Sequence, residues 1–361
     1  MKLEVKIKTL TPLWTGGVDA GKVDRIHETG ILGSLRWWYE VLVRGLGGDA
    51  CDPSQGKCGF NADKYAKSSA KDERQRLRDA GLCDVCQVFG AIGWRRRFRL
   101  TIVDNTKADA SVSSRITANR SYTDNQGKER RPTWYFPNDN NAKPRFGDLT
   151  FQIQSLAPDF SPEIITGLVQ FIADWVAIGA RARMGFGVIG IVVSGGMDTQ
   201  PLFDWLKPLV GSSTYADLPS LRNIFLARIA PQNGAQFTEI DTFNLKYDIR
   251  RLFANNKHLR HFIMGTVKGQ RIAAKVSISR PYNDGQKMCV WGWIPEEANV
   301  YSNSWNRDAV VKAIHDHLEA NYELKVWREM NSDRDTATPN SNNAVAWLRD
   351  LLAIEEEDDA A

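Results

Sequence analysis

Apolar and polar positions along the chain predict alternating strands and helices. Residues 2–10 alternate apolar and polar side chains, which is typical of a half-buried strand. In 31–46, apolar residues recur every three or four positions, which predicts a helix that buries a stripe including Leu35, Trp38 and Leu42. By the same criteria, further strands are expected at 97–103, 149–156 and 188–193, and a second helix at 162–178.

After a linker at 196–222, the second half of the chain repeats this order. Strands are expected at 223–229, 273–279, 287–294 and 324–328, and helices at 246–263 and 306–322. Strand, helix, strand, strand, helix, strand is the ferredoxin-like order. We therefore expect an α+β protein with two tandem ferredoxin-like domains. The predicted boundaries are 1–195 with insertions at 47–86 and 104–147, then the linker, then 223–330, and finally a polar linker, terminal helix and acidic tail at 331–361.

Two tryptophans fall outside the predicted core. Trp37 lies on the face of the first helix that also carries Arg36, Glu40 and Arg44. A large ring in this position often meets a partner, although single exposed aromatics also occur without one. Trp14 lies in a turn-rich segment and is expected to be exposed.

A glycine-rich loop at 179–187 follows the second helix and leads into a strand. It is not a nucleotide-binding P-loop, because that loop precedes a helix and places phosphate at its positive N-terminus. Here the loop follows the negative end of a helix, so Arg181 and Arg183 would have to bind any phosphate. The alternative is a glycine helix cap followed by a tight turn.

The distribution of charge favours an anionic partner. The net charge is +4, and it would be +9 without the five acidic residues at 355–359. Arginines cluster at Arg95, Arg96, Arg97 and Arg99, which suits nucleic acid, although solvated charge is the default interpretation. No apolar run reaches bilayer length and the first residues form a strand pattern rather than a signal peptide, so we expect a cytoplasmic protein.

The insertion at 104–147 is too long and polar for an ordinary connection, so it is either functional or disordered. Its segment 130–136 interleaves arginines with aromatic residues. Single-stranded RNA requires this combination, because cations bind phosphates and rings stack on bases.

Four cysteines suggest a structural zinc site. Cys51, Cys58, Cys83 and Cys86 have C-x6-C and C-x2-C spacings, and four thiolates complete a closed tetrahedral site. Ordinary free cysteines remain the alternative, and Cys289 is expected to be a buried thiol.

The sequence gives little support for a catalytic residue. Metal-independent RNA cleavage requires a general base near a 2′-hydroxyl, and His27 has Asp24 and Glu28 as neighbours in sequence. A histidine in a polar loop is more often a surface residue. We therefore name no catalytic residue.

Several stretches together resemble the RAMP superfamily of CRISPR systems, most of all the first-numbered subunit of type III-B (Cmr) effector complexes. They are 10–17 (LTPLWTGG), 28–38 (ETGILGSLRWW), 83–90 (CDVCQVFG), the glycine loop and 271–282 (RIAAKVSISRPY), and their order rather than any single one is specific. The resemblance implies RRM-related domains, a glycine loop that contacts RNA, and target cleavage by neighbouring subunits. Implied RNA-binding residues are Trp14, Thr15, Gly16, Gly17, Arg36, Trp37, Arg181, Arg183, Gly185, Gly187 and Arg271.

The expected function is therefore that of a non-catalytic RNA-binding subunit in an antiviral RNA-guided complex. It would cap the complex near the 3′ end of the guide RNA and help engage target RNA, beside other RAMP subunits. One alternative is a RAMP-type endoribonuclease that trims guide RNA. Another is a zinc-stabilised protein-interaction module without an RNA role.

Overall fold

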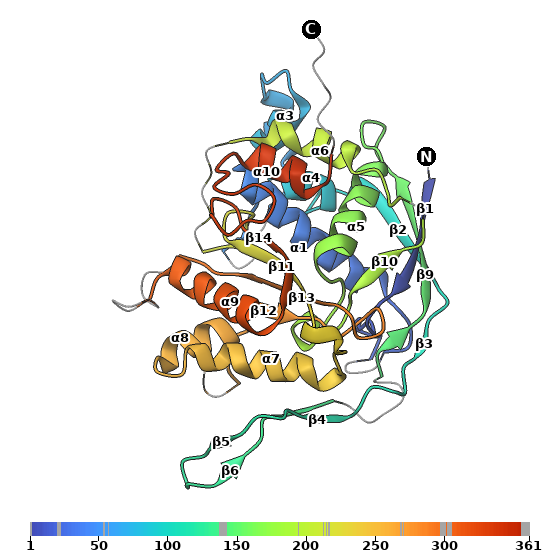
Figure 1. Cartoon of the computed structure of the whole chain (residues 1–361). Helices are drawn as coiled ribbons and strands as arrows, with labels where there is room; N and C mark the ends of the chain where they lie inside the picture. The colour runs from blue at the N-terminus through green and yellow to red at the C-terminus, as the bar shows by residue number, and fades with distance from the viewer. Residues whose placement is uncertain are drawn as a thin grey trace.

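The N-terminal half is built on a four-stranded antiparallel sheet, seen on the right of Figure 1. The computed structural model describes residues 2–19, 23–52, 55–56, 58–136, 143–193, 195–211, 213, 215, 217–267, 269, 271–296, 301 and 305–354. Alternation along the first strand buries Val5 and Ile7 and exposes Lys6 and Lys8. The strands, in the order β10-β1-β9-β2, are β1 (Lys2–Thr9), β2 (Phe98–Asp104), β9 (Asp148–Ser155) and β10 (Ile189–Ile191).

Helices α1 (Glu28–Leu46) and α5 (Glu163–Trp175) cover the inner face of this sheet. The buried stripe of α1 contains Leu35, Trp38 and Leu42, as the sequence predicts. The prediction that Glu40 and Arg44 lie on an outer face is wrong: both side chains are buried and paired with each other. The helix is covered on several sides, because the cysteine insertion and the C-terminal segment also pack on it.

The C-terminal half has a second four-stranded antiparallel sheet with the same topology. Counted within each half, both sheets have the order fourth, first, third, second. The predicted helix at 246–263 is two helices, because the Asn256 side chain caps a new helix by accepting from the Leu259 amide. The elements are β11 (Ile224–Ala230), α7 (Glu239–Leu252), α8 (Lys257–Met264), β12 (Val276–Ile278), β13 (Met288–Trp293), α9 (Arg307–Asn321) and β14 (Glu323–Arg328).

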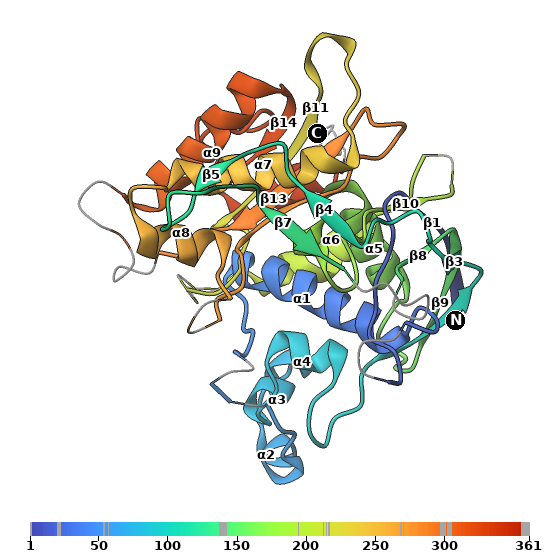
Figure 2. The same ribbon diagram turned by 90° about the horizontal axis from the view of Figure 1, so that it is seen from below.

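The cysteine insertion folds into three short helices, α2 (Ala62–Lys67), α3 (Glu73–Asp79) and α4 (Asp84–Phe89). Figure 2 shows them on one side of α1, with α7 on the other. A buried carboxylate joins α4 to α3, because Asp84 accepts two hydrogen bonds of 2.9 Å from the Arg78 guanidinium. The insertion is therefore an ordered unit that rests on α1.

The described parts of the predicted insertion, 104–136 and 143–147, form narrow antiparallel ribbons that extend across the C-terminal half (Figures 1 and 2). We call residues 115–135 the arm. Its strands are β4 (Arg115–Thr117), β5 (Tyr122–Thr123), β6 (Glu129–Arg130) and β7 (Thr133–Tyr135), and β3 (Lys107–Ala108) pairs with β8 (Arg145–Phe146) at its base.

The segment after β14 returns to the N-terminal half and joins the two halves. Helix α10 (Ala344–Leu351) contacts α1, and the Leu351 carbonyl accepts a hydrogen bond of 3.0 Å from Trp175 Nε1. The expected acidic tail lies outside the described residues. The other short elements are α6 (Gln200–Leu206) and the 3₁₀ turns 182–184, 207–209 and 232–234. Within the described ranges, no helix is both long and apolar enough to span a bilayer.

Candidate nucleic-acid interface and cysteine cluster

A groove of about 2140 Å³ lies between the two halves of the molecule. The first turns of α1 and the glycine loop line it from the N-terminal half, and α7, α8 and the β12–β13 region line it from the other. The arm contributes residues 122–126, Arg130 and 132–134. We call this space the basic groove.

The groove concentrates positive charge. Among the described residues that line it, nine are lysine or arginine and one, Asp124, is a carboxylate. Asp124 is itself paired with Arg130 at 2.9 Å. A surface with this imbalance attracts a polyanion. The cations are Arg130, Arg181, Arg183, Lys246, Arg250, Arg251, Lys257, Arg260 and Lys275.

Partial burial beside the groove lowers the pKa of Arg181 and of Arg183. Burial, followed by the charges of Arg183 and Arg250, lowers the pKa of Lys246 to about 8. An anion in the groove would offset this repulsion, because it would stabilise each charged form.

The glycines of the loop allow its main chain to pack closely against other segments of the protein. Gly187 has φ +93°, and a Cβ there would lie 2.0 Å from the Ile178 carbonyl oxygen. At Gly185 a Cβ would lie 2.7 Å from the Arg280 amide nitrogen, and the Gly185 carbonyl accepts a hydrogen bond from that amide. Both glycines are buried, so they bring the main chain against this protein's own segments rather than a ligand.

Two predicted residues of this loop, Arg181 and Arg183, are exposed and line the groove. Arg181 takes a left-handed conformation at φ 61°, and its guanidinium carbon lies 4.0 Å from the centre of the Trp14 ring. The expectation that Trp14 is exposed is wrong: 3% of its surface is accessible, because it packs in a third core cluster with Phe186. Trp14 therefore supports Arg181.

Trp37 also lines the groove, where it lies edge-on to Trp38 with ring centres 4.4 Å apart. Thr15 is buried and accepts a hydrogen bond from the His27 amide, and Gly16 and Gly17 are not among the lining residues. Arg271 is exposed, but its neighbour Ile272 lines the groove instead.

The arginine cluster after α4 lies away from the groove. Arg97 is buried and pairs with Asp159, which is inconsistent with the expected phosphate contact. Arg95 donates to the Leu156 carbonyl, Arg96 is half-buried, and Arg99 is exposed on the outer face of the N-terminal sheet.

The sequence analysis missed the basic face of α7 and α8. Lys246, Arg250, Arg251, Lys257 and Arg260 line the groove from these two helices. Lys246 and Arg250 are four residues apart, and Lys257 and Arg260 are three apart. Residues at these spacings share a helix face, and this was the available signal. Tyr122 and Tyr247 were also missed.

The four predicted cysteines come together behind α1. Their sulfur atoms all lie within 4.8 Å of one another, and Cys51 Sγ is 3.7 Å from Cys86 Sγ. Neighbouring sulfurs in a tetrahedral zinc site lie about 3.8 Å apart, given zinc–sulfur distances of roughly 2.3 Å. A hydrogen bond with Cys86 lowers the pKa of Cys83, and burial raises the pKa of Cys51.

Arg36 belongs to this cluster rather than to the groove. Its Nη2 donates to Cys86 Sγ at 3.2 Å, and its Nε donates to Glu40 Oε1 at 3.0 Å. The structure thus pairs Arg36 with sulfur, and its contact with phosphate stays a prediction. A cation at this distance offsets the negative charge of a four-thiolate metal site. The cluster therefore fits a divalent metal that prefers sulfur.

Histidines contribute little to the groove. His27 lies outside it, with Nε2 2.7 Å from Asp24 Oδ1. His261 is the one histidine among the described groove-lining residues, and burial followed by Arg250, Arg260 and Lys257 lowers its pKa.

A family model described as the RAMP superfamily matches residues 6–189. Among solved structures, the chain is matched by the apo crystal structure of Cmr1 from Pyrococcus furiosus, with 16% identity, TM-score 0.45, and coverage of 88% of this chain and 97% of the other. A chain of a type III-B Cmr-beta complex bound to cognate target RNA gives 10% identity, TM-score 0.42, and coverage of 87% and 99%. No curated protein matches the chain.

Proposed function

Because the chain belongs to the RAMP superfamily, we propose that it is a non-catalytic RNA-binding subunit of a type III-B CRISPR effector complex. Its basic groove holds single-stranded RNA. The observation that carries this proposal is the set of nine cations around one paired carboxylate in the groove. Half-buried and exposed rings beside these cations supply the stacking that single strands use.

The position in the complex follows from the resemblance of the ordered motifs to the first-numbered Cmr subunit. The subunit caps the assembly near the 3′ end of the guide RNA, helps engage target RNA, and contacts other RAMP subunits. Two tandem ferredoxin-like, RRM-related domains form it. Their shared strand order of fourth, first, third, second supports this assignment.

The RNA is bound without being cleaved by this chain. Metal-independent cleavage needs an acid and a base close to one 2′-hydroxyl. His261 has cations as its charged neighbours, and the carboxylate of Asp124 accepts from Arg130 and from the Gln126 and Lys128 amides. These contacts favour a binding role over the endoribonuclease alternative.

We propose zinc as the metal of the cysteine cluster. Four sulfurs at tetrahedral separations and a charge-compensating arginine favour a soft, closed site. The metal would tie the start of the insertion at Cys51 and Cys58 to α4, and so hold α2–α4 on α1.

The salt dependence of RNA binding tests the groove. We expect the double variants Arg181→Ala/Arg183→Ala and Arg251→Ala/Lys257→Ala each to flatten the slope of log K against log salt by about 1.4, since each neutralised phosphate in a single strand contributes about 0.7. The matched control is Lys8→Ala/Arg99→Ala, which removes two exposed cations from the outer face of the N-terminal sheet. A flatter slope in the control alone would contradict the proposal.

A further inference from the structure

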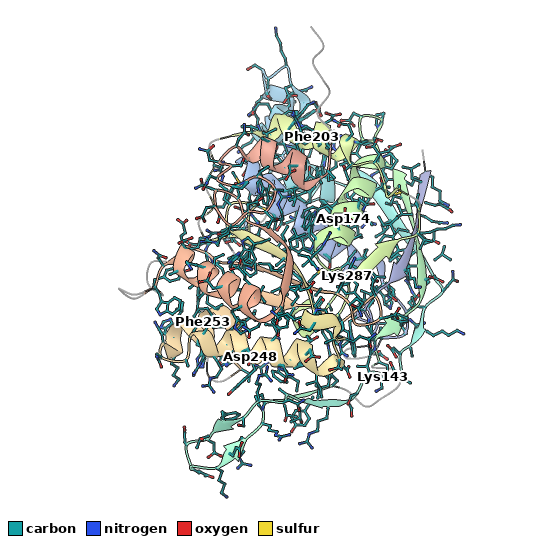
Figure 3. All side chains as sticks on the ribbon, viewed as in Figure 1. Lys143, Asp174, Phe203, Asp248, Phe253 and Lys287 are labelled. Atoms are coloured by element: carbon teal, nitrogen blue, oxygen red, sulfur yellow. The ribbon has the colours of Figure 1, made fainter. Side chains whose placement is uncertain are left out.

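The middle of the arm is joined to α7 by several hydrogen bonds. Arg120 donates two hydrogen bonds of 2.7 Å to the carboxylate of Asp248, which Figure 3 shows on the side of α7 that faces the arm. The Asn119 amide donates to Asn244 Oδ1 at 2.8 Å, and the Tyr247 hydroxyl donates to the Ser121 carbonyl at 3.2 Å. The arm thus has a defined position along this helix.

Aromatic packing also joins the second long strand of the arm, β7, to α7. Trp134 and Phe136 pack on Phe243 of α7, with ring centres 4.9 and 6.2 Å apart, and Phe136 also meets Phe186 of the glycine loop. The sequence analysis assigned the aromatic residues of 130–136 to RNA. Phe136 is buried and Trp134 is half-buried against α7, so both anchor this segment, and RNA contact by Trp134, which also lines the groove, stays a prediction.

The groove-facing side of the arm differs chemically from the helices around it. Thr123, Asn125 and Gln126 are uncharged and exposed, and Arg130 is paired with Asp124. The cations of α7, α8 and the glycine loop suit phosphates, whereas amides and hydroxyls suit the edges of bases.

One ring of the arm is available for stacking. Tyr122 lines the groove with 44% of its surface exposed. Its ring centre lies 6.5 Å from that of Tyr247, so the two rings are not in face-to-face contact. Tyr135 is also on the arm and 72% exposed, but it does not line the groove.

We propose that the arm contacts the bases of the single-stranded RNA whose phosphates are held by α7, α8 and the glycine loop, and that Tyr122 is its stacking platform. This inference rests on the proposed function. It gives the arm a role: it is the base-contacting wall of the groove, held in register by Arg120 and by packing on Phe243. Base contacts then depend on the arm, and phosphate contacts do not.

The test compares two ligands, a short fluorescent polyuridine RNA and an oligoribonucleotide of the same length and charge with abasic sites. Tyr122→Ala should weaken binding of polyuridine about tenfold, in line with the loss of one stacked base. It should leave binding of the abasic strand and the salt slope unchanged. Tyr135→Ala, the matched control, should bind both strands as the wild type does.

Equal loss for both strands, or no loss for either, would overturn the inference. The proposed function can be judged separately in the same titrations. If the double variants at Arg181/Arg183 and Arg251/Lys257 flatten the salt slope while Tyr122→Ala behaves as wild type, the groove binds RNA and the base-contacting arm is wrong. If the wild type binds neither strand, both proposals fail.

Discussion

Lys246 provides a quantitative test of the charge balance in the groove. Its Nζ donates to the carbonyl oxygen of Arg183, and its charged neighbours are Arg183 and Arg250. Replacing it with methionine keeps much of the side-chain volume and removes the charge. We expect Lys246→Met to stabilise the folded protein at neutral pH and to weaken RNA binding.

The magnitude follows from the pKa. Lowering the pKa of Lys246 from its ordinary value of 10.5 to about 8 reduces the free energy of unfolding by about 3 kcal/mol at pH 7, at about 1.4 kcal/mol per pKa unit. The variant removes this penalty but also loses the hydrogen bond to the Arg183 carbonyl, which costs about 1 kcal/mol. The expected net gain in the free energy of unfolding is about 2 kcal/mol.

The pH dependence has a definite sign. Between pH 8 and 10.5 the unfolded chain binds more protons at this lysine than the folded chain, so the wild type gains stability relative to the variant as the pH rises. The advantage of Lys246→Met should therefore shrink by about 2 kcal/mol between pH 7 and about pH 9.5.

Urea unfolding at these two pH values measures both effects. The control is Lys312→Met, because Lys312 is 57% exposed and paired with Asp316, and its replacement should change stability by less than about 0.5 kcal/mol. If Lys246→Met destabilises the protein at pH 7, or if its effect does not depend on pH, the account of a buried lysine beside other cations in the groove is refuted.

Three further outcomes are expected. Metal analysis should find close to one zinc per chain, and removing the metal with a chelator should increase protease cleavage in 47–97. The control variant Cys289→Ser should keep the metal, because Cys289 lies outside the cluster. Absence of bound zinc would contradict the assignment. Labelled RNA should remain intact with the wild type, and cleavage that His261→Ala abolishes would contradict a binding-only role. Gly187→Ala should lower the free energy of unfolding in urea by more than about 2 kcal/mol, because φ is +93° and the Ile178 carbonyl oxygen is close. Gly16→Ala should be nearly neutral, because there is open space around Gly16. Similar stabilities of the two variants would refute the packing role of the loop.

Hydrophobic periodicity was sufficient to predict most of the secondary structure. The strands at 2–10 and 149–156 and the helix at 31–46 match β1, β9 and α1 within a few residues. The break between α7 and α8 was missed because a basic, amphipathic pattern continues through the Asn256 cap. Burial of Glu40 and Arg44 was missed because the wheel of one helix does not show how many neighbours cover it.

The candidate site was predicted in part. The cysteine spacing identified all four members of the cluster, since ligand chemistry leaves few alternatives for such a pattern. The groove depends on long-range packing that sequence spacing does not encode: Arg183 and Arg250 are far apart in the chain but line the same space. Arg36 lies on the predicted outer face of α1, but only the fold shows that it contacts a cysteine sulfur.

Photo-crosslinking of single-stranded RNA to the wild-type protein, with the modified peptides identified by mass spectrometry, tests the central claim most directly. Crosslinks are expected in α7 and α8 (239–264), at the arm residues 122–134 and in the loop 179–184, because these segments line the basic groove. Crosslinks confined to the outer face of the N-terminal sheet, at β1 and β2, would contradict the claim that the groove holds RNA.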